Sequence, residues 1–350
     1  MEKKQDIRKL SADEIKAFFI AHKEQAFRAK QVYEWLWKKQ VTSFDEMTNL
    51  SVATRELLKQ HFDFKVVTIA EKQVSSDKTI KNAFRLFDGK ITEGVLIPTP
   101  KRMTACISSQ VGCSLTCAFC GTGKLDRLRN IDAEEIVDQV ALIKKQAEEH
   151  YQTPLSNIVY MGMGEPLLNY NNVLKSVELI TSDKGMGMSP RRITVSTAGI
   201  SKMIKKLGDD EVKFNLALSL HAANDAKRSE IMPINEQNSL ESLKEALQYF
   251  YDKTGTRVTF EYIIFKDFND SLEDAKELAE FCKCVPCKIN IIEYNPIDDA
   301  KFEKAEIAKT DKFAKFLEEK FNLIVNVRRS RGKDIDAACG QLANKNKAVS

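Results

Sequence analysis

The 350-residue sequence contains no hydrophobic run long enough for a signal peptide or a membrane span. The apolar stretch at residues 17–21 is too short for either purpose, and charged residues precede it. There is also no internal repeat and no low-complexity tract. We therefore expect a globular protein of the cytoplasm with no membrane partner.

The sequence also lacks a large excess of either positive or negative charge. The chain has 54 Lys and Arg against 50 Asp and Glu, which gives a net charge of +4. This mild basicity permits an RNA partner and fits an enzyme for small substrates equally well. A chain of this length builds its core without disulfides, so the eight cysteines are expected to be metal ligands or catalytic groups.

The first 95 residues are predicted to form a small accessory domain. Ser11 and Glu14 form a capping box before an apolar helical stripe, and residues 51–62 form a further helix. Two strands are expected near residues 65–75 and 79–87, and Asp88-Gly89 favours a tight turn. We expect the main domain at residues 96–343 and a tail at 344–350.

From about residue 100 the pattern alternates between strand and helix. Strands are predicted at residues 103–108, 157–162, 192–197, 213–221, 257–265 and 288–294, with a seventh at 323–329. Helices are predicted between them, for example at 132–150, 239–252 and 271–282. Such alternation predicts an α/β fold with a parallel sheet. Six units are too few for an eight-fold barrel, so we expect a partial (β/α)6 barrel with its site at the carboxyl ends of the strands.

The strongest motif is Cys113-Ser-Leu-Thr-Cys117-Ala-Phe-Cys120, in a loop after the first strand of this domain. Three thiolates at this spacing can hold three corners of an iron–sulfur cluster, which leaves the fourth iron open to a substrate. The alternative is a zinc site completed from elsewhere, for which Cys282, Cys284 and Cys287 are candidates.

Polar residues at the ends of other strands are candidates for cofactor contacts. Gly164 lets the backbone approach a ligand, and Glu165 offers a carboxylate to an ammonium group. Strand alternation places Ser196, Ser219 and His221 on the interior face, and Asn295 ends the sixth strand. For each of them, a satisfied polar residue at a strand end is the alternative interpretation.

The cysteine triplet resembles the signature of the radical S-adenosylmethionine superfamily. That resemblance implies a 4Fe-4S cluster at Cys113, Cys117 and Cys120, with S-adenosyl-L-methionine bound at the open iron. The superfamily also uses a partial (β/α)6 barrel, in agreement with the strand count. Further segments make the chain similar to the RlmN type of dual-specificity RNA methyltransferase: SSQVGC (108–113), MGMGEP (161–166), SPRR (189–192), MPIN (232–235) and DIDAACGQL (334–342).

The resemblance to the RlmN type implies methylation of C2 of an adenosine. The implied substrates are 23S rRNA, in the peptidyl transferase region, and tRNA, beside the anticodon, with two S-adenosylmethionine molecules used per turnover. Cys339 would carry the methyl group, and Cys106 would release the product through a transient Cys106–Cys339 disulfide. Glu93 matches the family's proton acceptor, although on sequence alone it is expected to be an exposed carboxylate after the hairpin. An electron donor such as flavodoxin or ferredoxin is implied, and we expect a monomer.

Both Cys106 and Cys339 also have a non-catalytic interpretation. Alternation places Cys106 on the interior face of the first strand, where a small core cysteine is common. Gly332 and Gly340 flank Cys339, so its segment could move, but it could equally be a packed or idle thiol.

Basic residues are expected around the mouth of the site and on the accessory domain, since RNA binding requires contacts with phosphates. The candidates are Lys124, Arg127, Arg129, Arg191, Arg192, Arg328, Arg329, Arg331 and Lys333, with Arg28, Lys30, Lys38 and Lys39 on the accessory domain. A solvated basic face is the alternative.

Two other functions remain open at this stage. One is a sister enzyme that methylates C8 of the same ribosomal adenosine, although Val111 and Pro166 favour the C2 type. The other is a zinc-stabilised RNA-binding protein without catalysis.

Overall fold

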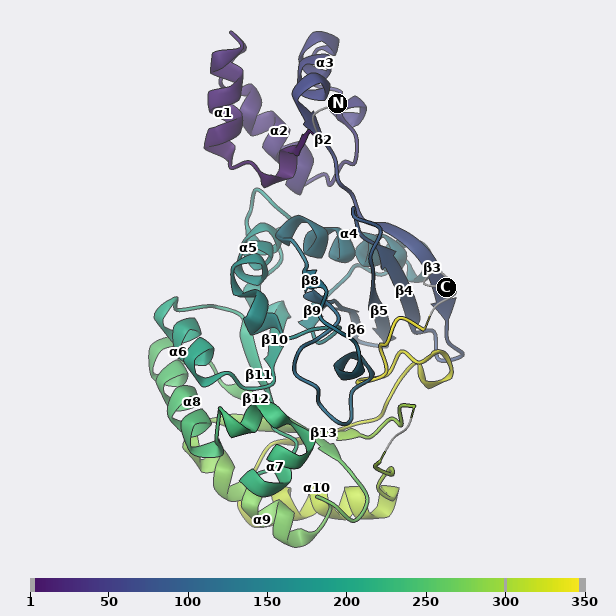
Figure 1. Cartoon of the computed structure of the whole chain (residues 1–350), viewed down its shortest axis with the longest axis vertical. Helices are drawn as coiled ribbons and strands as arrows, with labels where there is room; N and C mark the ends of the chain where they lie inside the picture. The colour runs from purple at the N-terminus through teal and green to yellow at the C-terminus, as the bar shows by residue number, and fades with distance from the viewer. Residues whose placement is uncertain (1–3, 299–300, 346–350) are drawn as a thin grey trace.

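The structure is a computed structural model that describes residues 4–298 and 301–345. A small helical unit stands at one end of a larger α/β part (Figure 1). Residues 346–350 of the expected tail lie outside the described residues. No helix in the described ranges is both long and apolar enough to cross a membrane.

The small unit consists of α1 (Ala12–Ala21), α2 (Arg28–Trp37) and α3 (Val52–His61). The predicted capping box is confirmed: Glu14 N–H donates to Ser11 Oγ over 3.2 Å, and Ser11 N–H donates to Glu14 Oε2 over 2.7 Å. The helix expected at 51–62 is confirmed as α3. Strands β1 (Gln5–Asp6) and β2 (Phe62–Asp63) pair in parallel and close the unit.

Within the described residues, ten strands form one open sheet in the order β14-β13-β12-β11-β10-β9-β6-β5-β4-β3. The parallel strands are β6 (Arg102–Cys106), β9 (Asn157–Tyr160), β10 (Ile193–Thr197), β11 (Asn215–Ser219), β12 (Val258–Ile264), β13 (Cys287–Glu293) and β14 (Val325–Arg328). These strands confirm those predicted from residue 103 onward, and the α/β fold with them.

Three antiparallel strands extend this sheet beyond β6: β3 (Thr68–Val74), β4 (Ile80–Arg85) and β5 (Ile91–Thr99). The first two were expected, and the hairpin predicted at Asp88-Gly89 is confirmed between β4 and β5, although no range was predicted for the strand after the turn. The boundary expected at residue 95 falls inside β5, so the expected 1–95 unit is divided between the helical unit and the large sheet. The expectation that Glu93 is exposed was wrong, because Glu93 lies on β5 and is fully buried.

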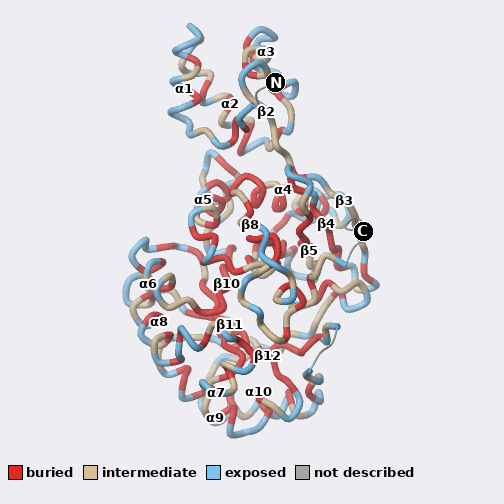
Figure 2. The backbone as a smooth tube through the Cα atoms, viewed as in Figure 1, coloured by how far each residue is buried: buried red, intermediate tan, exposed pale blue. Residues whose placement is uncertain are grey.

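Helices cross from each parallel strand to the next. They are α4 (Ala133–Tyr151), α5 (Tyr170–Thr181), α6 (Ser201–Asp209), α7 (Asp225–Ile231) with α8 (Leu240–Thr254), α9 (Leu272–Phe281) and α10 (Ile307–Phe321). Figure 2 shows the buried backbone concentrated in the sheet, with exposed backbone on the outer helices and loops. Leucine faces pack on the helices as predicted, since Leu216, Leu218 and Leu220 are fully buried. The functional site is therefore expected on the opposite face of the sheet.

Candidate functional site

The cysteine loop is closed at its base by a short antiparallel pair. Strand β7 (Gln110–Val111) pairs with β8 (Arg129–Asn130), so residues 112–128 project from the carboxyl end of β6. Gly112 has φ +76°, and a Cβ there would lie 2.0 Å from the Asp126 carbonyl oxygen. Only glycine fits at this position, because both the backbone conformation and the close contact exclude a side chain.

The three thiols of the loop lie close enough to affect each other's ionisation. Cys113, Cys117 and Cys120 are each half-buried. Burial is the largest cause that raises the pKa of Cys113, to about 11, and the neighbouring Cys120 thiol raises it further. The pKa of Cys117 rises in the same way, through burial and then through both other thiols. A positively charged centre would therefore relieve the cost of ionising Cys113 and Cys117.

The sequence spacing of these thiols is compatible with three thiolates that each bind a different iron of a cluster. No three His, Cys, Asp or Glu side chains in the described ranges converge as ligands of one metal ion. Zinc requires thiolates at about 2.3 Å from one centre. In a four-iron cube each thiolate binds a different iron, so the three sulfurs stand further apart.

Glu165 is a buried carboxylate beside this loop. Its Oε2 accepts the Ala198 N–H over 2.7 Å and its Oε1 accepts the Leu167 N–H over 3.0 Å. Burial raises its pKa, and none of the ion pairs found among the described residues includes it. A buried carboxylate without a cation fits an incoming ammonium group, such as that of a methionine moiety.

Gly164 allows the turn before Glu165 to approach the cysteine loop. Its φ is +92°, and a Cβ there would lie 2.4 Å from the Gln110 Cβ. Gln110 in turn accepts the Glu165 N–H over 2.8 Å. Gln110 belongs to the SSQVGC motif but was assigned no role from the sequence, whereas the structure shows that it fixes the backbone of Glu165.

The remaining predicted cofactor residues gather at the carboxyl ends of neighbouring strands. Ser196 and Ser219 lie on adjacent strands, with their Oγ atoms 3.4 Å apart. His221 is buried, and its Nδ1 accepts the Ile263 N–H over 3.0 Å, which leaves Nε2 for a ligand. Burial lowers the pKa of His221 to about 3, so its ring is neutral. Asn295 is also buried, and its Nδ2 lies 3.4 Å from the Cys339 carbonyl oxygen.

Arg228 on α7 is a functional candidate that the sequence did not reveal. It is fully buried, and its guanidinium donates to the carbonyl oxygens of Ala198, Ser219 and Leu220 at 2.6, 3.2 and 3.1 Å. These contacts fasten together the ends of β10 and β11. Burial lowers its pKa to about 10, while the charge of the nearby Cys117 raises it.

The C-terminal segment, residues 332–345, lies against the cysteine loop. The Gly121 N–H donates to the Gly340 carbonyl over 2.7 Å, and Thr122 Oγ1 donates to the Leu342 carbonyl over 2.6 Å. A pocket of about 240 Å³ opens between the two, lined by Gly121, Lys124, Pro296, Asp336, Gln341 and Ala343 among others. The predicted Cys339 thus lies on a segment that is attached to the cysteine loop through Gly340 and Leu342.

Cys339 and Cys106 are electrostatically coupled across this site. Cys106 is buried on β6, and burial followed by the Cys339 charge raises its pKa to about 12. Cys339 keeps contact with solvent, yet the segments around it still desolvate its thiol and raise its pKa, an effect that Arg328 opposes. The structure therefore brings together two thiols separated by 339 − 106 = 233 positions.

Comparison with known proteins identifies this arrangement. Residues 5–63 match the family model "Ribosomal RNA large subunit methyltransferase N-terminal domain", and residues 107–282 match "Radical SAM superfamily". The chain is 64% identical over 98% of its length to a "Probable dual-specificity RNA methyltransferase RlmN" from Cytophaga hutchinsonii, of which 94% is covered. The chain belongs to the RlmN family of radical SAM RNA methyltransferases. A Staphylococcus aureus RlmN relative is 43% identical, with 99% of this chain and 94% of the relative covered.

A solved structure agrees over the whole RlmN fold. A radical SAM methyltransferase from Sphaerobacter thermophilus matches with a TM-score of 0.91 and 36% identity, covering 98% of this chain and 99% of that one. The hydrogenase maturase HydG matches with a TM-score of 0.51 and 13% identity, covering 68% of this chain and 55% of that one. The second likeness shows only the shared fold. Membership of the superfamily implies a 4Fe-4S cluster and S-adenosylmethionine.

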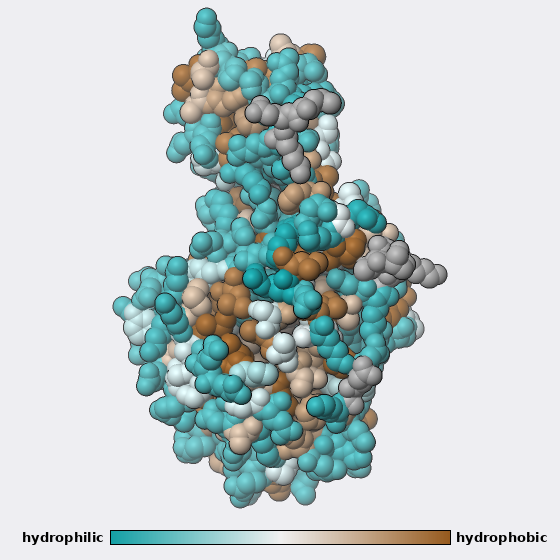
Figure 3. All heavy atoms as spheres, in the orientation of Figure 1, coloured by the Kyte–Doolittle hydropathy of each residue, from teal (hydrophilic) through white to brown (hydrophobic). Residues whose placement is uncertain are grey.

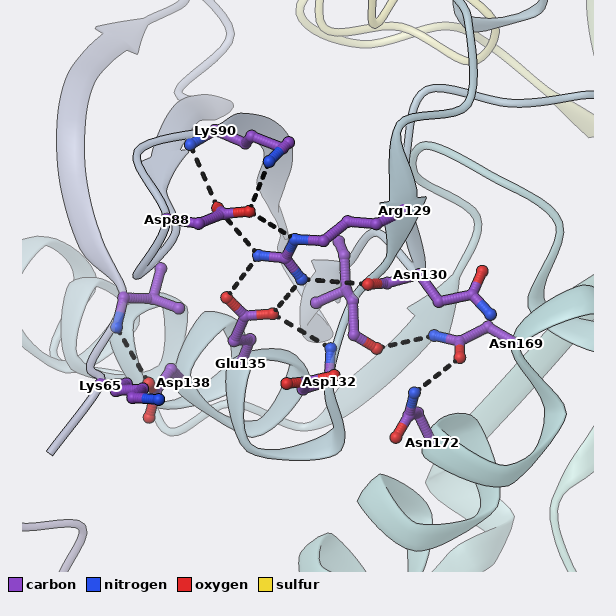
Figure 4. A network of polar contacts seen from close by, with 12 residues as sticks. Lys65, Asp88, Lys90, Arg129, Asn130, Asp132, Glu135, Asp138, Asn169 and Asn172 are labelled. Carbon is purple, nitrogen blue, oxygen red and sulfur yellow. Dashed lines mark hydrogen bonds and ion pairs between the residues drawn. The ribbon is translucent and has the colours of Figure 1, made fainter. Parts of the chain in front are cut away.

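Several basic residues of this RlmN-family chain that were predicted to bind RNA instead form ion pairs with carboxylates of the protein itself. Figure 4 shows Arg129 of β8 between Asp88 and Glu135, at 2.8 and 2.7 Å. Arg328 pairs with Glu261 at 3.3 Å. Glu293 pairs with Arg329, Lys333 and Lys304 at 2.8, 3.1 and 3.2 Å.

The other basic residues predicted to bind RNA in the larger part differ in position and in their contacts. Arg191 and Arg192 are exposed, but they precede β10 at the amino end of the strands, opposite the site. Arg331 lies 3.4 Å from the Asp77 carbonyl oxygen, and Lys124 donates to that of Asp298. Arg127 is exposed on the cysteine loop itself.

The candidates on the helical unit remain at its surface. Lys30, Lys38 and Lys39 are exposed, and Lys39 lies 3.5 Å from the ring centre of Trp35. Arg28 pairs with Glu24. Figure 3 shows a mainly hydrophilic surface on this unit, whereas hydrophobic atoms gather across the middle of the larger part.

The cysteines proposed to complete a zinc site stand apart from the loop. Cys282 and Cys284 lie in a 3-10 turn that follows α9, and Cys287 begins β13, at the amino end of the strands. Their neighbours include Lys244 and Arg257 rather than Cys113, Cys117 or Cys120. The zinc site expected as an alternative, with these cysteines as partners, is not assembled.

Proposed function

We propose that this protein methylates C2 of an adenosine in 23S rRNA and in tRNA beside the anticodon, through a methyl group carried on Cys339. One observation supports this above all. The segment that holds Cys339 is fastened to the cysteine loop, and its thiol interacts with those of both Cys106 and Cys120. A methyl carrier must reach both the source of the radical and a second thiol, and the attachment of this segment to the cysteine loop supports that role for Cys339.

The residues that would hold the cofactors are those at the carboxyl ends of the strands. Cys113, Cys117 and Cys120 would hold the 4Fe-4S cluster, and Glu165 would bind the methionine ammonium group. Ser196, Ser219, His221 and Asn295 remain for the carboxylate, ribose and adenine. S-adenosylmethionine bound there supplies a methyl group and, when reduced, a 5′-deoxyadenosyl radical.

The chain's own residues would perform the other steps. C2 of adenine has no nucleophilic lone pair, so the Cys339 sulfur first accepts a methyl group from one S-adenosylmethionine. Loss of a hydrogen atom from this methyl group lets its carbon join C2, which links enzyme and RNA covalently. Glu93 would then take the proton from C2, and the unpaired electron of the adduct would pass back to the cluster site that supplied it. Cys106, as a thiolate, would attack the Cys339 sulfur and form the disulfide. The carbon–sulfur bond breaks, and the released carbon takes the electron pair and a proton, so that the methylated base leaves.

Two variants test these roles together. Cys106→Ala should retain covalently bound RNA when purified from cells, because the adduct forms but cannot be resolved. Cys339→Ala should lose methylation by more than about a hundredfold and trap no RNA, since the carrier is absent. Gel mobility before and after nuclease treatment measures the adduct. If Cys106→Ala is purified without bound RNA, the role assigned to Cys106 in resolving the covalent adduct is contradicted.

Nucleoside mass spectrometry decides between C2 and the alternative carbon C8. RNA treated with the reconstituted enzyme should yield 2-methyladenosine. 8-Methyladenosine as the sole product would show that the chain acts as the C8 type. Assays of rRNA and tRNA with flavodoxin or ferredoxin as reductant would compare the two substrates and donors.

A further inference from the structure

Glu93 is the anchor of the C-terminal segment. Its Oε2 accepts the backbone N–H groups of Ala343 and Asn344 at 2.9 and 3.0 Å. The Asn344 side chain adds a bond to the Ile91 carbonyl oxygen over 3.1 Å. Figure 1 shows the yellow C-terminal segment beside β4 and β5. Cys339 is thus held from one side by Glu93 and from the other by the cysteine loop.

The anchor is charged and deeply buried. Glu93 is fully buried on β5, and Lys81 on β4 is 4% exposed, with its Nζ 3.6 Å from Glu93 Oε1. Lys345, at the end of the segment, also lies within electrostatic reach of Glu93. Glu93 Oε1 has no hydrogen-bond partner among the described atoms. One carboxylate oxygen therefore holds the segment while the other faces a cation.

Protonation of this carboxylate would weaken both sets of contacts. Hydrogen bonds to an ionised acceptor are about twice as strong as those to a neutral one. A neutral Glu93 would also lose its attraction to Lys81 and leave that cation buried without a partner. The hold on Ala343 and Asn344 therefore depends on the negative charge of Glu93.

We propose that Glu93 is a positioning residue for Cys339, and that a proton gained by its carboxylate releases the C-terminal segment. The timing of this release rests on the proposed function, in which Glu93 takes the proton lost from C2. The segment is held while the covalent adduct forms. Arrival of the proton then frees Cys339 to approach Cys106, so that resolution follows deprotonation.

Hydrogen–deuterium exchange of the anaerobically purified full chain tests the anchor without RNA. Glu93→Gln is neutral and has nearly the same shape, so it represents the protonated carboxyl group. We expect amides of the C-terminal segment to exchange about tenfold faster than in the wild type, while those of β12 remain unchanged. Glu71→Gln is the matched control, because Glu71 lies on β3 of the same sheet and bonds to Gln73 rather than to the segment.

A double variant controls for the possibility that Glu93→Gln alone misfolds. Glu93→Gln leaves Lys81 unpaired, so Glu93→Gln combined with Lys81→Met removes both charges and should release the segment equally. Wild-type exchange of the segment in either variant overturns the proposal. Because this measurement needs no turnover, loss of RNA methylation with unchanged exchange would refute the anchor alone. Released segments in Glu93→Gln, together with a wild-type enzyme that makes no 2-methyladenosine, would refute the proposed function alone.

Discussion

At the residue scale, the ionisation of the proposed carrier thiol, Cys339, depends on its surroundings in the fold rather than on its sequence neighbours. Burial is the largest influence on Cys339 and raises its pKa above the ordinary value of 9.0, while Arg328 acts in the opposite direction. A raised thiol pKa means that less thiolate is present at neutral pH, and the thiolate is the nucleophile.

Alkylation of Cys339 should therefore keep accelerating as the pH rises through 9. Iodoacetamide labelling followed by peptide mass spectrometry measures this thiol separately from the other seven. The same thiol in the urea-unfolded chain is the control, and its rate should level off at a lower pH. A rate in the folded protein that is already maximal at pH 8 would show that the Arg328 charge outweighs burial.

Glu293 shows the opposite shift. Burial alone would raise its pKa, but hydrogen bonds from Arg329, Lys333 and Lys304 outweigh burial and bring it to about 2. A carboxyl pKa lower than in the unfolded chain contributes stability above about pH 4.5 that is lost as the pH falls toward 2.

Glu293→Gln should thus remove part of the acid sensitivity of this protein. We expect the variant to lose on the order of 2 kcal/mol of unfolding free energy at pH 7, and the difference from the wild type to shrink between pH 5 and 2. Urea denaturation at several pH values measures it. Asp311→Asn, at the exposed partner of Arg329, should leave the acid profile unchanged.

At the scale of the elements, the turn between β9 and α5 depends on the absence of a side chain at Gly164. Gly164→Ala combines strain at φ +92° with a 2.4 Å contact to Gln110. It should cost about 1–3 kcal/mol and weaken S-adenosylmethionine binding, because Glu165 would be displaced. Calorimetric titration and thermal unfolding test both effects. Gly187→Ala, with φ +67° and open space around it, separates strain from the clash.

The sequence predicted the elements well where apolar periodicity was strong. The parallel strands and α4, α8 and α9 follow patterns of period 2 and 3.6, and Cys113, Cys117 and Cys120 have a spacing that indicates their chemistry by itself. Strand β5 was missed because Gly94 and Pro98 interrupt it. The buried positions of Glu93, Lys81 and Arg228 arise from tertiary pairing, which no local pattern records.

At the scale of the whole molecule, the helical unit is joined to the sheet domain by a buried ion pair. Arg8 is 5% exposed and contacts Asp6 at 2.9 Å and Asp138 of α4 at 2.7 Å. Asp138 also accepts the Val67 N–H over 3.0 Å. One guanidinium therefore connects both parts and the linker between them.

Arg8→Met should loosen this joint strongly, because it leaves the buried Asp6 and the half-buried Asp138 without their cation. We expect a loss of about 3 kcal/mol and an earlier unfolding transition for the helical unit. Differential scanning calorimetry measures the transition. Lys9→Met removes the neighbouring, more exposed pair with Asp132, and should cost less than about 1 kcal/mol. Equal losses in both variants would contradict the importance of Arg8.

The C-terminal segment also has a consequence for how the protein reaches its native state. Its Gly332 N–H bonds to Asp77 and its Asp334 to Ser75, so it ties the end of β14 to the turn between β3 and β4. These are the two rims of the open sheet, and contacts between such distant positions form late during folding. Until they form, both rim strands are available to pair with another copy of the chain. Refolding at high protein concentration should accordingly yield aggregates, and the yield of native protein should depend on how quickly this last link closes.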